Sequence, residues 1–276
     1  MRVNDRASGI NSRGEPVDID RQAANAARVY DYLLGGTANF EVDRAAGEQS
    51  GAAFPGGLDG ARASVRSNRD FLARAVRYLA GEAGIRQFLD LGTGIPNEDN
   101  VHHLAQQVAP DARIVGVDYD PVVLAHAHEL LNSTPEGAVA FIDGDFREPE
   151  AVLEQAADTL DFSRPVAVML VAILHLIDDD SDPYGLVGRL MDAVPSGSYL
   201  AMTHLTNDLL DMTETARILT EAMREPMVLR TRAEFTRFFD GLELVEPGVV
   251  PVDEWRPDTP PTGRFIAHYA AVARKP

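Results

Sequence analysis

Short apolar segments alternate with amphipathic helical segments through most of the chain, and this alternation limits the folds that the chain can adopt. The predicted strands are residues 87–91, 113–117, 139–142, 165–174 and 198–203, and the predicted helices that follow them are 97–108, 121–131, 149–157, 183–193 and 208–223. Strands that alternate with helices predict a mostly parallel, doubly wound sheet with helices on both faces. Two later strands, 242–247 and 266–272, and a short helix, 232–239, complete an α/β fold with a seven-stranded sheet.

Changes in composition divide the chain into three parts. Residues 1–18 are polar and contain glycine, proline and mixed charge, so we expect a disordered tail. Residues 19–82 carry helical periodicity without strands and are predicted to form a helical cap, or lid, over the sheet. Residues 83–276 hold the strand–helix alternation and form the main domain, which we expect to make one compact unit with the cap.

Within the cap, the sequence predicts two helices. The first covers residues 21–34, with Asp20 as its N-cap and the glycines at 35–36 at its end. The segment SGAAFPGGLDG, residues 50–60, is predicted to be a loop because glycine and proline dominate it. The second helix covers residues 64–79.

Composition excludes several classes of function. The 276 residues contain no cysteine, so disulfides, thiolate zinc sites and a cysteine nucleophile are excluded. A formal net charge of −18 repels phosphate backbones and argues against nucleic acid as a partner. No apolar run approaches the ~20 residues that a membrane-spanning helix needs, and the first residues lack the apolar core of a signal peptide. We expect a cytoplasmic protein with no membrane partner.

The stretch FLDLGTGIP, residues 88–96, places a glycine loop directly after the first strand of the sheet. Glycines there let backbone N–H groups approach a ligand closely. In a dinucleotide-binding loop a third glycine would follow Gly92 and Gly94 at position 97, which is asparagine here. A small zwitterion with a carboxylate therefore fits better than a diphosphate. Pro96 is predicted to begin the next helix.

Aspartates follow successive strands beside this loop. Asp90 could face a ligand's ammonium group or cap the turn, and both interpretations stay open. Asp118 ends the second strand, where a carboxylate can accept both hydroxyls of a ribose. Asp145 follows the third strand and could accept from an adenine amine, with Phe146 packing on the ring. Each alone is typical of a strand-end cap, whereas the three together indicate a pocket for S-adenosylmethionine.

These motifs resemble those of class I S-adenosylmethionine-dependent methyltransferases: DLGTGIP the first motif, GVDYD the second and DGDF the third. A closer resemblance is to a bacterial S-adenosyl methyltransferase family that was long a domain of unknown function. It extends over nearly the whole chain from about residue 21 and includes RVYDYLLGGTANFEVDR (28–44), NRDFLARAVRYLA (68–80), DFSRPVAVMLVAILHLI (161–177) and PSGSYLAMTH (195–204). The resemblance implies a Rossmann-like fold and S-adenosylmethionine as cofactor, with Thr93 and Tyr119 in its motifs. It implies no particular acceptor.

Methyl transfer needs an acceptor atom held in line with the methyl group, so positioning supplies much of the catalysis. We expect a small-molecule acceptor, methylated on O or N, beyond the fourth strand. His175 is the predicted general base, because histidine titrates near neutral pH, and His204 is a weaker candidate. A packing role for each histidine stays open. The acidic residues 178–180 and 182 are interpreted as a solvated loop and helix cap, and no metal is predicted.

The cap is expected to contribute to the site. Tyr30, Tyr32 or the backbone at Gly36 could reach the cofactor or the acceptor, although a helix end with core tyrosines explains them equally well. Arg69 could meet the methionine carboxylate. Trp255 could cover the acceptor or only pack a loop.

Two other classes of function are weighed against the methyltransferase. A non-catalytic sensor or regulator that binds S-adenosylmethionine would need no general base. A nucleotide-dependent oxidoreductase or epimerase is disfavoured by the missing third glycine and by the lack of a Tyr-x-x-x-Lys pair. The sequence leaves a homodimer open.

Overall fold

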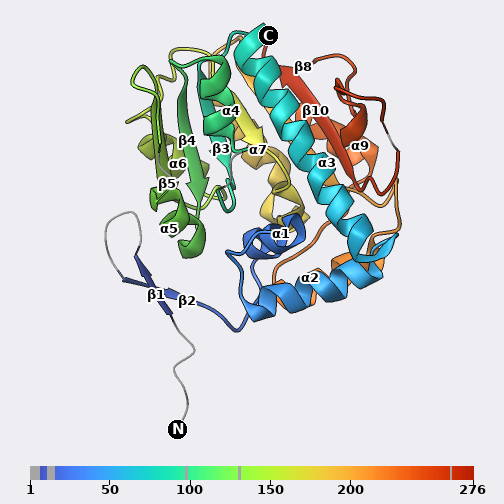
Figure 1. The fold of residues 1–276 in the computed structure, drawn as a ribbon. Helices are drawn as coiled ribbons and strands as arrows, with labels where there is room; N and C mark the ends of the chain where they lie inside the picture. Colours follow the sequence, from blue (N-terminus) through green and yellow to red (C-terminus); the bar gives the residue numbers. More distant parts are fainter. Residues whose placement is uncertain (1–6, 11–15, 97–98, 130–131, 262) are drawn as a thin grey trace.

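The fold centres on one mixed sheet, shown in Figure 1. The structure is a computed structural model, and it describes residues 7–10, 16–96, 99–129, 132–261 and 263–276. The strands of the sheet are β3 (Gln87–Leu91), β4 (Arg113–Asp118), β5 (Ala138–Asp143), β6 (Ala167–Leu170), β7 (Tyr199–Leu205), β8 (Glu243–Leu244) and β10 (His268–Arg274). They follow the order β5-β4-β3-β6-β7-β10-β8, and the short β9 (Val250–Pro251) also pairs with β10. The predicted seven-stranded, mostly parallel α/β sheet is confirmed.

Strands β3 to β7 are parallel, and β10 runs antiparallel to β7 with His268 opposite Leu205. Every residue of β3, β6 and β7 is buried, because helices cover both faces of a parallel sheet. The carboxyl ends of the parallel strands therefore share one edge, where ligands of such sheets bind.

The apolar run at 165–174 was predicted as one strand, and this prediction is wrong at its end. Strand β6 ends at Leu170, and Ala172 takes a left-handed backbone with φ +57°. A 3₁₀-helix then covers Leu174–Leu176. The left-handed turn redirects the chain, so His175 lies on a short helix rather than at a strand end.

The helices after the strands are α4 (Val101–Val108), α5 (Pro121–Glu129), α6 (Pro149–Ala156), α7 (Pro183–Asp192), α8 (Thr213–Met223) and α9 (Arg232–Thr236). A helix follows each strand from β3 to β7, as the sequence pattern predicts. The prediction that Pro96 begins the first of these helices is wrong. Helix α4 begins at Val101, with Asn100 as its N-cap, so Pro96 lies in the loop before it. Asn97 lies outside the described residues.

The cap contains α1 (Ala26–Leu34), α2 (Glu41–Ala53) and α3 (Gly57–Arg77), which a π-helix at Tyr78–Glu82 extends. Figure 1 shows α1 and α2 near the edge where the parallel strands end, while α3 runs across a face of the sheet. The N-cap of α1 is Asn25, whose side chain accepts from two backbone N–H groups, and not the predicted Asp20. Gly35 ends α1 in the left-handed conformation, as predicted.

The predicted loop at 50–60 is wrong, because α2 and α3 occupy most of it. The glycines of α2 allow close helix packing rather than irregular backbone. A Cβ at Gly47 would lie 2.5 Å from Tyr32 Cδ1, and one at Gly51 would lie 2.7 Å from Leu58 Cδ1. Glycines, which favour a loop prediction, therefore lie in α2 where that helix packs closely against α1 and α3.

A two-stranded hairpin, β1 (Ala7–Ile10) with β2 (Pro16–Ile19), forms in the predicted tail. The expectation of an irregular segment over 1–18 therefore differs from the structure at these residues.

Trp255 packs in the core beneath α3. Its side chain is fully buried, with ring centroids 5.4 Å from Phe71 and 5.8 Å from Tyr78. Arg74 on α3 donates to the Trp255 carbonyl at 2.9 Å. Of the two interpretations of Trp255, packing of a loop is the one that the structure supports.

Candidate active site

The loop after β3 is held by the neighbouring strand. Gly92 and Gly94 have left-handed backbones, with φ +71° and +64°. The N–H groups of Gly92 and Thr93 donate to the carbonyl of Val117, at 2.8 and 3.2 Å. A Cβ at Gly92 would lie 2.6 Å from Ile173 Cδ1, so glycine is needed there for space as well as for conformation.

Asp118 anchors the same loop, which is a role that its position in the sequence does not reveal. Its Oδ2 accepts from the N–H of Gly94 at 2.9 Å, and its Oδ1 accepts from the N–H of Asp120 at 3.0 Å. Burial raises the pKa of Asp118 to about 6, although these backbone hydrogen bonds oppose the shift. Each carboxylate oxygen has a second lone pair, so the side chain can still accept from ligand hydroxyls.

Asp90 lies in β3, buried beside the loop. Burial raises its pKa to about 7; the positive charge of Arg69 opposes this shift and the negative charge of Asp118 adds to it. Arg69 donates to the Asp99 carbonyl at 2.7 Å and to Asn100 Oδ1 at 2.8 Å. A carboxyl with a raised pKa in a cavity is a common property of functional sites.

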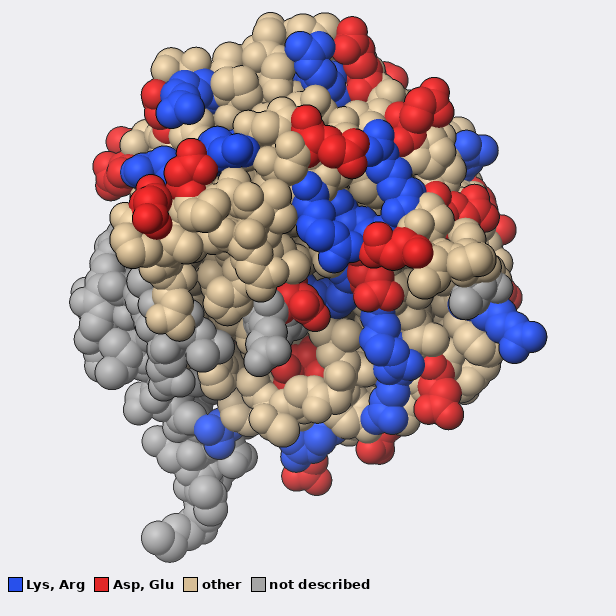
Figure 2. Space-filling view, turned by 45° about the horizontal axis from the view of Figure 1, so that its top comes forward, with Lys and Arg blue, Asp and Glu red and all other residues tan. Residues whose placement is uncertain are grey.

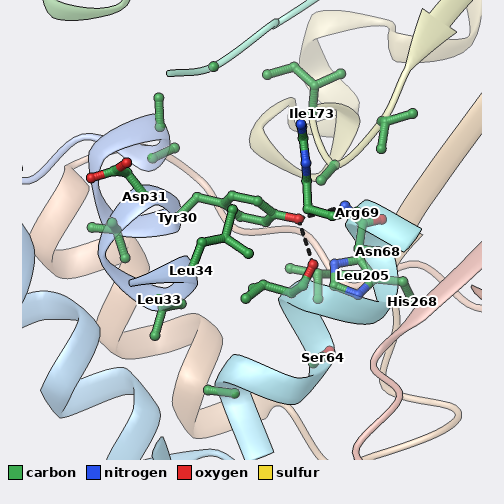
Figure 3. A pocket seen from close by; sticks show the side chains of 18 of the residues that line it. Tyr30, Asp31, Leu33, Leu34, Ser64, Asn68, Arg69, Ile173, Leu205 and His268 are labelled. Atoms are coloured by element: carbon green, nitrogen blue, oxygen red, sulfur yellow. Dashed lines mark hydrogen bonds between the residues drawn. The ribbon is translucent and has the colours of Figure 1, made fainter. Parts of the chain in front are cut away.

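A cavity of about 1010 Å³ begins at this loop and extends under the cap. Figure 3 shows part of it between α1 and α3. The predicted site residues that line it are Tyr30, Gly36, Arg69, Asp90, Gly92, Thr93, Gly94, Asp118, Tyr119 and His175. The structure thus brings together residues from the cap, the glycine loop and the strand ends.

Asp145 and Phe146 do not line this cavity. Arg147 holds the Asp145 carboxylate through its Nε, 2.8 Å from Oδ1, and its Nη2, 2.6 Å from Oδ2. Phe146 is buried in the core on one side of the sheet. The structure does not bring these two residues to the cavity wall with the others.

Tyr119 connects the end of β4 to the segment after α8. Its hydroxyl donates to Glu225 Oε1 at 2.9 Å. Burial and the charge of Glu225 raise the pKa of Tyr119, so the phenol stays protonated. Glu225 carries no motif, and the sequence gives no signal for this contact.

The far end of the cavity is apolar. Side chains from the cap, from α8 and from the loops around the sheet form its wall: Leu33, Leu34, Phe54, Leu176, Leu205, Met212, Leu219, Met223, Met227 and Phe265. We call this part the apolar chamber. Several of these residues also belong to one hydrophobic cluster, in which side chains of α1 and α8 pack together.

His175 is buried at the cavity wall near two other histidines. Its ring centroid lies 5.9 Å from that of His204 and 6.5 Å from that of His268. Burial first, and then the charges of these neighbours and of Arg230, holds the pKa of His175 well below its ordinary value. Among the described residues nothing hydrogen bonds to His175 Nδ1, so a neutral imidazole faces the cavity with one nitrogen unsatisfied.

His204 has a structural role. Its Nε2 lies 2.8 Å from Arg230 Nη1, which can only donate, so Nε2 must accept. Its Nδ1 therefore carries the proton and donates to the Leu205 carbonyl at 2.7 Å. Both nitrogens are occupied, and His204 has no lone pair left to act as a base.

Two of the four acidic residues after His175, Asp178 and Asp182, act as caps, as predicted. Asp178 Oδ1 accepts from the Ser181 N–H, and Asp182 Oδ1 accepts from the Gly185 N–H, each at 3.0 Å. Asp179 pairs with Arg230 at 2.6 Å. Within the described ranges, no group of three or more histidine or carboxylate side chains is placed to hold a metal ion.

The strand order, the glycine loop and the carboxylates at the ends of β3 and β4 define a class I, Rossmann-like methyltransferase. The buried carboxylates that line the cavity beside the loop suit a ligand that carries an ammonium group and ribose hydroxyls. The chain belongs to the S-adenosyl methyltransferase family, whose model matches residues 12–276. S-adenosylmethionine is the methyl donor in this family.

Solved structures agree with this assignment. The chain is 46% identical to a DUF574 family protein from Streptomyces avermitilis, with a TM-score of 0.89 over 93% of this chain and 99% of that one. It is 45% identical to a candidate methyltransferase from Thermobifida fusca, with a TM-score of 0.84 over 93% and 96%. Magnesium protoporphyrin IX methyltransferase from Synechocystis, with bound S-adenosylmethionine, shares the fold at 11% identity, a TM-score of 0.50 and 90% coverage of both chains. A comparison with curated proteins finds no match.

Proposed function

We propose that the protein transfers the methyl group of S-adenosylmethionine to an oxygen or nitrogen atom of an apolar small molecule. The observation that carries this proposal is the continuity of the cavity. One wall holds the glycine loop, Asp90 and Asp118, and the same cavity continues into the apolar chamber. Donor and acceptor can therefore meet in one continuous cavity, which is what methyl transfer requires.

The donor side is assigned to residues of the strand ends. When bound, S-adenosylmethionine supplies a methyl group activated by a sulfonium sulfur. In our proposal Asp118 accepts from the ribose hydroxyls, Asp90 faces the ammonium group, and Arg69 lies near the carboxylate. The loop backbone at 92–94 provides close approach, and Tyr30 and Gly36 bound the site from the cap.

The pH dependence of donor binding tests the role of Asp90. Ionisation of a carboxyl with a pKa of about 7 increases from roughly one tenth at pH 6 to roughly nine tenths at pH 8. An ammonium group binds the ionised form, so the affinity for S-adenosylhomocysteine should rise about ten-fold over this range. Calorimetry of the wild type and of Asp90→Asn measures this. The variant should bind more weakly and with a much shallower profile, because only Asp118, whose pKa is about 6, still titrates near this range. A flat wild-type profile would contradict the assignment.

His175 is the proposed partner of the acceptor's hydroxyl or N–H group. Its imidazole is neutral at neutral pH because burial disfavours the charged form. A neutral imidazole can accept a hydrogen bond that orients the acceptor and can receive the proton released on methylation. The lowered pKa makes it a weak base, so orientation is expected to contribute most of its effect.

Replacing His175 with alanine should therefore lower kcat by about 100-fold, the lower end of the range for a general base. The affinity for S-adenosylhomocysteine should change less than three-fold, because the residue lies on the acceptor side. Single-turnover assays and calorimetry measure the two quantities separately. A loss of cofactor affinity with unchanged turnover would make His175 a structural residue instead.

Surface charge gives no support to a nucleic-acid acceptor. Figure 2 shows acidic and basic side chains intermixed on one face rather than a continuous basic surface. On α3, for example, Arg77 pairs with Asp258 at 2.6 Å. No helix among the described residues is both long and apolar enough to cross a membrane.

A panel of acceptors tests the proposal, with formation of S-adenosylhomocysteine as the readout. We expect turnover with uncharged aromatic or aliphatic alcohols and amines, and none with sugars, nucleotides or amino acids. Turnover confined to charged, hydrophilic acceptors would contradict the proposal. If the protein binds S-adenosylmethionine but methylates no member of the panel, the alternative of a non-catalytic sensor or regulator would be favoured.

A bulky substitution tests the placement of the acceptor. Leu219→Trp should fill part of the apolar chamber and lower turnover of a two-ring acceptor at least about ten-fold, since overpacking displaces what a cavity holds. The affinity for S-adenosylhomocysteine should stay unchanged. Glu221→Trp places the same ring at an exposed position of α8 and serves as the matched control. Equal turnover by both variants would mean that the acceptor binds elsewhere.

A further inference from the structure

A hydrogen bond fixes the orientation of the Asn68 side chain on α3. The Tyr30 hydroxyl lies 3.0 Å from the carbonyl oxygen of Val65, which can only accept, so the hydroxyl donates its one proton there. The same hydroxyl must then accept from Asn68, whose Nδ2 lies 2.9 Å away. The amide nitrogen is thereby committed to Tyr30. Asn68 Oδ1 is left as an acceptor, and no described residue donates to it.

Two more buried polar atoms lie on the same side of the cavity. Ser64 Oγ belongs to the preceding turn of α3, and His268 Nδ1 belongs to the first residue of β10; within the described residues neither has a hydrogen-bond partner. Ser64, Asn68 and His268 are 2%, 1% and 3% exposed, and all three line the cavity. Helix α3, which carries Ser64 and Asn68, contacts β10, which carries His268, and Figure 3 shows the three residues in the same part of the pocket view. We call these three residues the polar pole.

The three residues of the polar pole are uncharged, and apolar side chains line the cavity near them. Burial first, and then the charge of His204, lowers the pKa of His268 to about 3, so its imidazole is neutral at neutral pH. Leu205 lies opposite His268 in the sheet, and Figure 3 shows Leu33 and Leu34 on the cap side of the same space. A buried acceptor without a donor is costly, whereas a ligand that supplies the donor removes that cost.

We propose that the polar pole recognises an uncharged hydrogen-bond donor, a hydroxyl or an amide N–H, on an otherwise apolar methyl acceptor. This inference rests on the proposed function, because it takes the apolar chamber as the acceptor site. Asn68 Oδ1 makes the primary contact, and His268 and Ser64 surround the same group. A carboxylate ligand would meet the lone pairs of Asn68 Oδ1 and be repelled. The ligand class is therefore a neutral alcohol, phenol or amide rather than an acid.

Two probes of equal shape test the proposal. 2-Naphthol and 2-methylnaphthalene differ only by a hydroxyl in place of a methyl group, and both suit an apolar chamber. Binding is measured by fluorescence titration of the full chain saturated with S-adenosylhomocysteine, which prevents turnover. We expect the wild type to prefer 2-naphthol by about ten-fold or more, because a site built around an unpaired acceptor rejects the analogue without a donor.

Two variants test which side chain causes the preference for 2-naphthol over 2-methylnaphthalene. Asn68→Leu should remove it by weakening 2-naphthol binding about ten-fold while leaving 2-methylnaphthalene unchanged. Thr215→Val is the matched control, because Thr215 Oγ1 is also buried in the cavity wall without a described partner but lies on α8. This variant should keep the wild-type preference. If Asn68→Leu fails to fold, the two probes are compared on His175→Ala, because His175 is the other proposed partner of the hydroxyl. A preference that this variant keeps supports the polar pole, and a preference that it loses overturns the polar pole.

The possible failures are distinguishable. Equal affinity of the wild type for the two probes overturns the polar pole and leaves the apolar chamber intact. Binding of neither probe overturns the chamber, and the polar pole with it. If Thr215→Val loses the preference and Asn68→Leu keeps it, a residue of α8 recognises the hydroxyl, and the assignment to the polar pole is overturned. A ten-fold loss of S-adenosylhomocysteine affinity in Asn68→Leu, with the preference kept, assigns Asn68 to the donor site and also overturns it.

Discussion

Gly92→Ala is expected to reduce the affinity for S-adenosylmethionine by about 30-fold or more. The left-handed backbone at this position disfavours a side chain by ~1–2 kcal/mol. The new Cβ would also lie 2.6 Å from Ile173 Cδ1, and overpacking of this kind costs about 1–3 kcal/mol. Because Val117 and Asp118 hold the loop on both sides of Gly92, it cannot relax without losing those hydrogen bonds. Calorimetric titration measures the change.

Two control variants separate the causes. Gly94 has a similar φ of +64° but open space around its missing Cβ, so Gly94→Ala should show only the conformational part of the loss. Adding Ile173→Ala to Gly92→Ala should recover part of the affinity by removing the overlap. Wild-type affinity in Gly92→Ala would show that this loop does not approach the donor.

Arg230→Met is expected to lower the free energy of unfolding by about 2–4 kcal/mol, because buried hydrogen-bond acceptors lose their charged donor. The guanidinium is 2% exposed and donates to the carbonyls of Leu174 and Ile177, each at 3.0 Å. It also donates to His204 Nε2 at 2.8 Å. Methionine fills similar space but leaves the Ile177 carbonyl and His204 Nε2 without this donor, whereas the Leu174 carbonyl keeps the N–H of Ile177 at 3.3 Å. Chemical denaturation monitored by circular dichroism measures the loss.

Arg237→Met is the matched control for this substitution. Arg237 is exposed and stacks 4.2 Å from the centroid of the Tyr184 ring, so its loss should cost less than about 1 kcal/mol. Asp179→Asn should also have a small effect, because the Asp179 side chain is 73% exposed and solvent screens its pair with Arg230. Equal stability of Arg230→Met and the wild type would contradict the role of this network in fixing the segment around His175.

The sheet was predictable because its signal is local and repeated. Each strand from β3 to β7 is a short apolar run followed by a helix, and burial on both faces explains that composition. The meeting of the glycine loop and Asp118 at one edge of the sheet was predictable, because the carboxyl ends of parallel strands converge there. Their part in donor binding stays a prediction. By contrast, α2 was missed because Gly47 and Gly51 serve contacts between helices, which a single sequence does not separate from loop propensity.

The acceptor side was less predictable, because its residues meet only through tertiary structure. Asn68 and His268 come from α3 in the cap and from β10 in the main domain, which are far apart in the sequence. Nothing local distinguishes His268 from a packed histidine. The orientation of Asn68 depends on Tyr30 in the cap, and the tautomer of His204 depends on Arg230. Such properties follow from hydrogen-bond geometry and not from residue type or spacing.

A calorimetric titration of the wild-type protein with S-adenosylmethionine, S-adenosylhomocysteine and NAD tests whether the cavity is a methyl-donor site. We expect both adenosyl compounds to bind with one site per chain and a Kd on the order of micromolar. We expect no binding of NAD, because the loop that follows β3 lacks the third glycine that a diphosphate bridge favours. Binding of NAD, or of neither adenosyl compound, would contradict the assignment of the cavity at Gly92, Asp90 and Asp118 as the donor site.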